Sequence, residues 1–140
     1  MARSLHHAAL CPGDLDASLR FYRDGLGLEV LMDHGFDGDW PQLFGVGSGH
    51  LRSIFLGDPD GPDAGVVELV DFGVERASTS GVGAPLRGFF LLSFNVDLDA
   101  TLDRLRALGV ELRSRITVHG VDMAVVLDPD GTRVELIDLP

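Results

Sequence analysis

Three side chains of types that bind divalent metal ions stand within apolar stretches of this 140-residue sequence. Glu68 and Glu135 each follow a valine and precede a leucine, and His7 opens an alanine-rich run. A carboxylate buried alone in an apolar strand is costly, so it needs either exposure or a positive partner. One imidazole and two carboxylates suit Fe(II), Mn(II), Ni(II), Co(II) or Zn(II). The alternative is that both glutamates face solvent or pair with arginines such as Arg52 or Arg133.

An internal repeat relates these residues to one another. The string Asp-Leu-Asp-Ala-Ser-Leu at 14–19 recurs as Asp-Leu-Asp-Ala-Thr-Leu at 97–102, an offset of 83. The strings that hold Glu68 and Glu135 match at an offset of 67, and each follows an Asp-Pro-Asp-Gly turn. Applied to His7, the offset of 83 predicts Phe90 as its counterpart. A duplicated chain would then have four equivalent positions, three of them occupied by metal-ligand types.

The sequence pattern of each half predicts one helix and four strands. Asp14 is a good N-cap, and the spacing of the leucines that follow is helical. We expect helices at 14–26 and 97–108, and strands at 5–11, 28–33, 50–56, 66–72, 89–96, 110–118, 122–127 and 133–139. The sequence therefore predicts an α+β fold of two βαβββ modules that form a cup-shaped mixed sheet. The single domain, 1–140, would comprise module one at 1–73, a Gly- and Ser-rich linker at 74–87, and module two at 88–140.

Strand alternation decides which side chains line the concave face of such a sheet. His7, Ala9 and Cys11 share one face of the first strand, and Glu68, Val70 and Phe72 share one face of the fourth. We expect His6 to face the helix instead. His34, His50 and His119 are expected near the surface, with His50 or His119 as alternatives for a fourth ligand.

An aromatic insertion at 33–49 has almost no equivalent in the second half. It contains Phe36, Trp40 and Phe44, which would suit a lid over an organic ligand. A satellite core or a dimer contact is the alternative. The apolar wall of the substrate pocket would be completed by Phe55, Phe72, Phe90, Phe94 and Met123.

The composition excludes several classes of partner. The formal net charge of -11 disfavours nucleic acid and anionic membrane surfaces. A single cysteine permits no intramolecular disulfide and suits a reducing, cytoplasmic setting. We recognise no signal peptide and no stretch that approaches the roughly 20 apolar residues of a membrane span.

The run from His7 to Leu28 resembles the opening module of the vicinal oxygen chelate superfamily. The ending from Asp128 to Leu136 resembles its closing strand. The superfamily includes glyoxalase I, methylmalonyl-CoA epimerase, fosfomycin-resistance transferases, extradiol dioxygenases and bleomycin-binding proteins. The resemblance implies a glyoxalase-like fold, with His7, Glu68 and Glu135 at metal-ligand positions. Phe90 stands where the second-module histidine is found, so an intact site of the commoner enzymes is in doubt.

Two main functions follow from the resemblance and the residues. One is a divalent-metal-dependent lyase, isomerase or dioxygenase acting on a small oxygen-bearing substrate, with Glu68 or Glu135 as general base. The other is non-catalytic sequestration of an aromatic or cationic small molecule, as in antibiotic resistance by bleomycin-binding-like proteins. Association with another protein is a weaker third possibility. A homodimer is expected, because members often build each cup from two chains and a fourth strand such as 66–72 would leave an edge to be paired.

Overall fold

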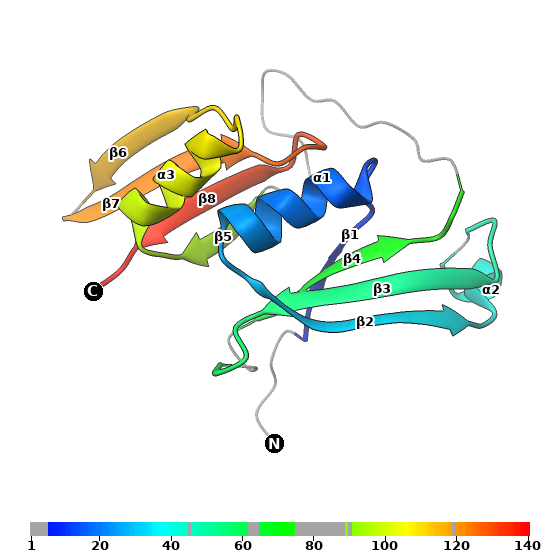
Figure 1. Ribbon diagram of the computed structural model, residues 1–140. Helices are drawn as coiled ribbons and strands as arrows, with labels where there is room; N and C mark the ends of the chain where they lie inside the picture. Colours follow the sequence, from blue (N-terminus) through cyan, green and yellow to red (C-terminus); the bar gives the residue numbers. More distant parts are fainter. Residues whose placement is uncertain (1–5, 45, 62–64, 75–88, 90, 119) are drawn as a thin grey trace. The chain divides into compact units, whose positions relative to one another are not determined.

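The computed structural model contains two four-stranded mixed sheets, and it describes all residues except 1–5, 45, 62–64, 75–88, 90 and 119 (Figure 1). The first sheet has the order β1-β4-β3-β2, formed by β1 (Ala8–Leu10), β4 (Val67–Asp71), β3 (His50–Gly57) and β2 (Glu29–Asp37). The second has the order β5-β8-β7-β6, formed by β5 (Leu92–Asn95), β8 (Arg133–Asp138), β7 (Val121–Leu127) and β6 (Ser114–Val118). The α+β class is confirmed, and the identical strand order agrees with the sequence repeat. The cup itself stays a prediction.

Each sheet begins with one parallel pair, and its other pairs are antiparallel. In the first sheet β1 runs parallel to β4, and in the second β5 runs parallel to β8. The strand at 66–72 was expected to leave an open edge, but β4 lies between β1 and β3. That reason for dimerisation was therefore wrong, and the edges of the first sheet are β1 and β2.

One face of the first sheet is closed and apolar. Ile54, Leu56, Val67 and Leu69 are buried on β3 and β4. Residues directly opposite each other on neighbouring strands share a face, so the pairing of Phe55 with Glu68 puts both on the other face. Alternation along β4 therefore puts the buried Val67 and Leu69 on one face and Glu68 on the other.

The second sheet has the same division, with α3 (Leu98–Ala107) lying against it (Figure 1). Asp97 caps this helix, since its side chain accepts a hydrogen bond from the Ala100 amide at 3.1 Å. The sheet's buried face consists of Ala124, Val126, Val134 and Leu136. Helix α3 buries Leu98, Leu102 and Leu105, the leucine stripe that its sequence predicts.

The first helix packs against α3, the helix that lies on the second sheet. It consists of α1 (Leu15–Leu19) and a wider turn, η1 (Arg20–Gly25), in which the Leu26 amide donates to the Phe21 carbonyl at 2.9 Å. Gly25 permits a close approach to α3, because a Cβ there would lie 2.5 Å from Leu105 Cδ2. Arg104 on α3 donates to the Gly25 carbonyl at 3.0 Å.

The chain accordingly forms two compact units. One comprises Met1–Leu15 and Leu28–Ala77, and the other Asp16–Gly27 and Ser78–Pro140. Most of the first helix therefore belongs to the unit that contains the second sheet. The division into modules at 1–73 and 88–140 with a linker at 74–87 stays a prediction, and residues 75–88 lie outside the described part.

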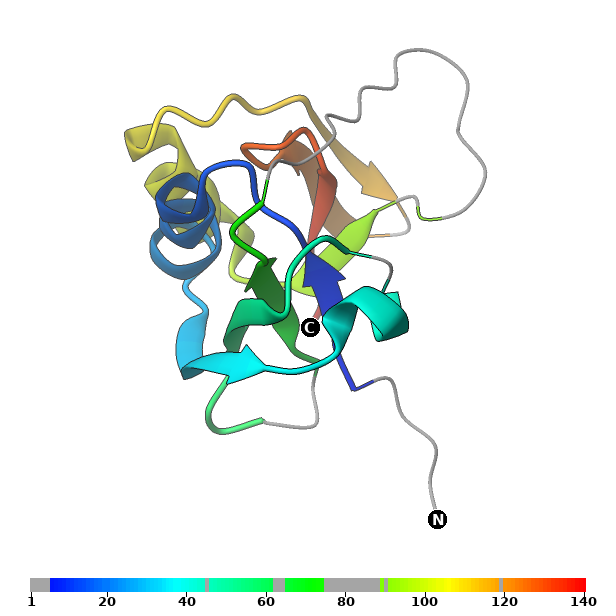
Figure 2. The same cartoon turned by 90° about the vertical axis from the view of Figure 1, so that its right-hand side faces the viewer.

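The insertion forms a longer hairpin than the sequence indicates. Strand β2 was expected to end at residue 33, but it pairs with β3 as far as Asp37, which lies opposite His50. A short helix, α2 (Trp40–Phe44), occupies the end of this hairpin (Figure 2). Pro41 suits the first turn of a helix, where the missing amide hydrogen is not needed. The sequence did not predict α2.

Candidate functional site

His7 and Glu68 come together at the junction of β1 and β4. The His7 Nε2 atom lies 3.5 Å from Glu68 Oε1. The Glu68 side chain is 16% exposed, and the His7 side chain is 35% exposed. The alternative of a glutamate that points to bulk water is therefore wrong for Glu68. An imidazole nitrogen and a carboxylate oxygen at this separation can both coordinate one metal ion or can share one proton.

Two further side chains hold this pair in place. Ser53, buried on β3, donates a hydrogen bond of 2.5 Å from its Oγ to Glu68 Oε2. The Nδ1 atoms of His6 and His7 lie 2.8 Å apart, so one ring donates to the other. His6 was expected to face the helix, but its ring centroid lies 6.0 Å from that of Phe55. Both oxygens of Glu68 and both ring nitrogens of His7 therefore have neighbours.

A cavity of about 530 Å³ opens on the same face of the first sheet. Glu68 lines it, so the carboxylate meets a largely apolar space. The aromatic side chains Phe36, Trp40, Phe55 and Phe72, all named from the sequence, line it as well. The remaining lining residues are Ala9, Met32, Val46, Leu51, Ser53 and Val70. Phe44 ends α2, and its side chain is not among the described groups.

Glu135 occupies the corresponding position in the second sheet. It lies on β8 opposite Val125 and beside Ser93, as Glu68 lies on β4 opposite Phe55 and beside Ala9. Ser93 Oγ donates to Glu135 Oε1 at 2.8 Å. Met123 shares this face, two residues before Val125 on β7. Each unit therefore presents a serine-bound glutamate on the face opposite its apolar layer.

The strand register corrects the predicted counterpart of His7. Ala9 lies beside Glu68, and Ser93 lies beside Glu135. Two residues before these positions are His7 and Leu91, so the equivalent residue is Leu91, whereas Phe90 was predicted. The link from strand to helix cap is one residue shorter in the second half, and this shifts the offset. Phe90 itself lies outside the described residues, and Leu91 is also not a metal-ligand type.

Phe94 packs away from the candidate site. It lies beside the buried Leu136 in the sheet, and its ring centroid is 6.3 Å from that of Tyr22. The sequence placed Phe94 on the apolar wall of the pocket. Because Phe94 follows Ser93 on β5, its side chain points to the helix-covered face, opposite Glu135.

Two of the alternative partners suggested by the sequence, Arg52 and His50, are engaged elsewhere. Arg52 donates to both oxygens of Asp33 at 2.9 and 2.8 Å. These hydrogen bonds hold the pKa of Asp33 below its usual range. His50 Nδ1 lies 2.7 Å from Asp37 Oδ1, and both side chains are exposed. His119, the other alternative ligand, lies outside the described residues.

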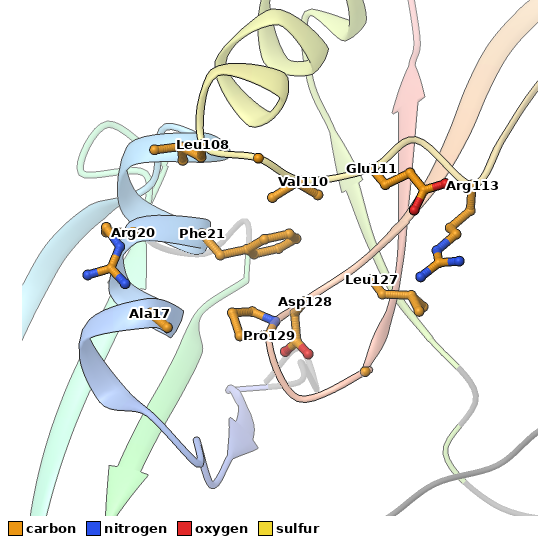
Figure 3. Close-up of a pocket in the computed structure, with 12 residues that line it drawn as sticks. Ala17, Arg20, Phe21, Leu108, Val110, Glu111, Arg113, Leu127, Asp128 and Pro129 are labelled. Carbon is orange, nitrogen blue, oxygen red and sulfur yellow. The ribbon is translucent and has the colours of Figure 1, made fainter.

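A second cavity, of about 480 Å³, lies within the other unit (Figure 3). The Phe21 ring points toward Val110 inside it, with Arg20 on one side and Arg113 beside Glu111 on the other. Asp128 also lines it, but its Oδ2 accepts a hydrogen bond from the Tyr22 hydroxyl at 2.7 Å. The sequence did not indicate this cavity, because its walls come from a helix, a loop and a turn that are far apart along the chain.

The fit of a metal can be judged from the donors present. Among the residues that the structure describes, no group of three or more His, Cys, Asp or Glu side chains could hold a metal ion. His7 and Glu68 supply two donors of the types that divalent transition metals accept. The first unit therefore fits part of a coordination shell, and further donors have to come from outside it.

Comparisons with known proteins agree on one family. A family model described as the glyoxalase/bleomycin resistance protein/dioxygenase superfamily matches residues 4–136. The chain is 38% identical to the lactoylglutathione lyase-like protein terB of Aspergillus terreus, over 98% of this chain and 76% of that protein. It is 32% identical to a probable lactoylglutathione lyase of Synechocystis, over 95% of this chain and 93% of that protein.

Solved structures give the same result. Glyoxalase I of Leishmania major, described as trypanothione-dependent, is 28% identical, with a TM-score of 0.67 over 98% of this chain and 87% of that one. A glyoxalase family protein of Bacillus cereus reaches a TM-score of 0.79 at 19% identity, over 99% and 95% of the two chains, and supports the fold alone. Within the described residues, every helix is too short or too polar to cross a membrane.

Proposed function

The chain belongs to the glyoxalase/bleomycin resistance protein/dioxygenase superfamily, and on this premise we propose that it is a divalent-metal-dependent lyase, isomerase or dioxygenase. Its substrate is a small organic molecule that carries neighbouring oxygens. The observation that carries the proposal is the His7–Glu68 pair, with Glu68 in the wall of an aromatic-lined cavity. Donors of metal-ligand type and a space for an organic ligand thus share one face of one sheet.

In this proposal the metal is held by His7, Glu68 and Glu135, with Fe, Mn, Ni, Co and Zn all suitable by ligand type. Glu135 is included because its place in the second sheet repeats that of Glu68 in the first. It could come from the same chain or from a second copy. A bound divalent ion polarises substrate oxygens and stabilises negative charge that develops on them.

The protein's own groups have separate tasks. Glu68 or Glu135 acts as the general base and accepts a proton from the carbon next to the substrate oxygens. The serine hydroxyls, Ser53 on Glu68 and Ser93 on Glu135, orient the two carboxylates. The aromatic side chains around Glu68 exclude water, which strengthens electrostatic interactions in the cavity.

Metal analysis of protein purified without chelator tests the proposal. We expect stoichiometric metal in the unaltered chain and at least a tenfold loss of affinity in His7→Ala and in Glu68→Gln. His50→Ala is the matched control, because His50 pairs with an exposed aspartate away from these donors. Metal-free protein, or full binding by both variants, would contradict the proposal.

Sequestration without chemistry is the second candidate. It is favoured by Leu91, an apolar residue at the position equivalent to His7, and by the apolar lining of the cavity. Tight binding of a planar drug by metal-free protein, with no turnover, would support this alternative.

We also propose a homodimer in the cytoplasm. Ile116 and Val118 are exposed on the edge strand β6, at 53% and 41%, and apolar groups on a sheet edge favour pairing with another chain. The single cysteine suits a reducing compartment. A molar mass of one chain by light scattering at micromolar concentration would refute the dimer.

A further inference from the structure

We infer that the cavity beside Glu68 selects an uncharged, aromatic or otherwise apolar substrate and excludes lactoylglutathione, the compound in the names of the relatives. This inference rests on the proposed function, because it assigns a substrate class to the same site. It is carried by the charges and shapes of the side chains that line the cavity.

The lining contains no cation among the described residues. Of its eleven residues, nine are apolar or aromatic, and the two polar ones, Ser53 and Glu68, are hydrogen-bonded to each other. Arg52 neighbours Ser53 on β3, but alternation turns it to the opposite face, where Asp33 binds its guanidinium. A ligand in this cavity therefore meets mainly apolar surface, and the one charged side chain of the described lining, Glu68, is a proposed metal ligand.

Lactoylglutathione fits such a lining poorly. Its glutathione part carries two carboxylates and one ammonium group at neutral pH. Carboxylates that leave water without a cationic or hydrogen-bonding partner are strongly disfavoured. The net charge of -11 adds a field that repels these carboxylates. An uncharged aromatic compound avoids both penalties and gains contact with four aromatic rings.

The wall that faces such a compound belongs to the insertion. Trp40 is held in one orientation, because its Nε1–H donates to the Phe36 carbonyl at 3.2 Å. The indole packs over Gly38, where a Cβ would lie 2.9 Å from Trp40 Cζ2. A held ring needs little ordering when a ligand binds, so Trp40 is suited to contact a planar molecule.

Trp40 also supplies the assay, because it is the only tryptophan in the chain. The probes are 2,3-dihydroxynaphthalene, which is uncharged and carries neighbouring oxygens, and S-lactoylglutathione. We expect the naphthalene to quench Trp40 fluorescence with a Kd at least tenfold lower than that of S-lactoylglutathione. Free N-acetyltryptophanamide corrects for absorption by the probe. Equal or tighter binding of S-lactoylglutathione, or no response of Trp40 to the naphthalene, would overturn the inference.

Two variants examine the physical basis. Met32→Arg adds a cation to the lining from the edge strand β2, and it should tighten S-lactoylglutathione binding at least fivefold while weakening that of the naphthalene. Gly38→Ala displaces the indole and should weaken the naphthalene several-fold with the far-ultraviolet circular dichroism unchanged. Unchanged preference in folded Met32→Arg would contradict the charge argument.

The outcome can be separated from that of the proposed function. His7→Ala should lose metal but keep the preference for the uncharged probe, since the lining is intact. If the unaltered chain binds no metal and still prefers the naphthalene, the substrate class stands and the metal chemistry fails. If it binds metal and prefers S-lactoylglutathione, the metal chemistry stands and this inference fails.

Discussion

Replacing Tyr22 by phenylalanine removes one hydroxyl from the interior of the second unit. Tyr22 is fully buried, and its hydroxyl donates to Asp128 Oδ2 at 2.7 Å. The other oxygen of Asp128 accepts from the amides of Asp130 and Thr132 at 2.9 and 2.8 Å, so the turn that leads into β8 is built on this carboxylate. Tyr22→Phe leaves Asp128 Oδ2 without the hydroxyl that donates to it.

The expected cost follows from that geometry. A hydrogen bond to a charged group contributes about 1.5–3 kcal/mol to stability, and the ring itself still fills its space. We expect Tyr22→Phe to lower the free energy of unfolding by about 2 kcal/mol. In a domain of this size that corresponds to a fall in Tm of roughly 4–8 °C. Urea and thermal unfolding followed by circular dichroism measure both quantities.

The same contact predicts a pH dependence. Burial, reinforced by the charge of Asp128, raises the pKa of Tyr22 well above its ordinary value. The unfolded chain ionises its tyrosine near pH 10, whereas the folded chain keeps the proton. The stabilisation is therefore complete below about pH 10 and is lost as the pH rises further. Because Tyr22 is the only tyrosine, tyrosinate absorbance reports it alone.

A double-mutant cycle of Tyr22→Phe with Asp128→Asn isolates the pair. Additive losses within about 0.5 kcal/mol would show that the two groups are not coupled and would refute the reasoning. Ionisation of Tyr22 near pH 10 in protein that keeps its native circular dichroism would do the same.

Three other predictions concern single side chains. Ser53→Ala removes the hydroxyl that orients Glu68 and should weaken metal binding about 10–100-fold, as measured by chelator competition. An unchanged metal affinity would show that Ser53 has no such role. Gly25→Ala forces a methyl group against Leu105 and should lower the free energy of unfolding in urea by about 1–3 kcal/mol. A free energy of unfolding equal to that of the unaltered chain would mean that α3 shifts away without cost. Cys11 is exposed, so a thiol reagent should modify one thiol per chain in the folded protein, and modification only after unfolding would contradict this exposure.

The sequence predicted the faces of the strands well. Alternation along the strand predicted at 66–72 put Glu68 and Phe72 on one face, and both line the cavity. The insertion's Phe36 and Trp40 were also expected in a pocket, and they line the same space. These predictions depend only on the period of a strand and on the clustering of aromatic residues, which are local properties.

The errors arose where distant parts of the chain decide the structure. The offset of 83 was measured on the two matching helix segments, and it made Phe90 the counterpart of His7. The link between strand and helix is one residue shorter in the second half, and this difference cannot be seen until the strands are paired. The leucine spacing of the first helix shows which side is buried but not which sheet covers it. The order of strands in a sheet is likewise absent from local patterns, so β4 was taken for an edge.

The assignment of residues 16–27 to the unit with the second sheet has a consequence for any attempt to divide the chain. A cut in the segment between the repeats leaves residues 16–27 on the fragment that holds the first sheet, and it removes from the other fragment the helix that packs against α3. Neither fragment should form its native core by itself. Expressed together, the two fragments should reassemble, because the helix at 16–27 can then pack against α3 as it does in the intact chain.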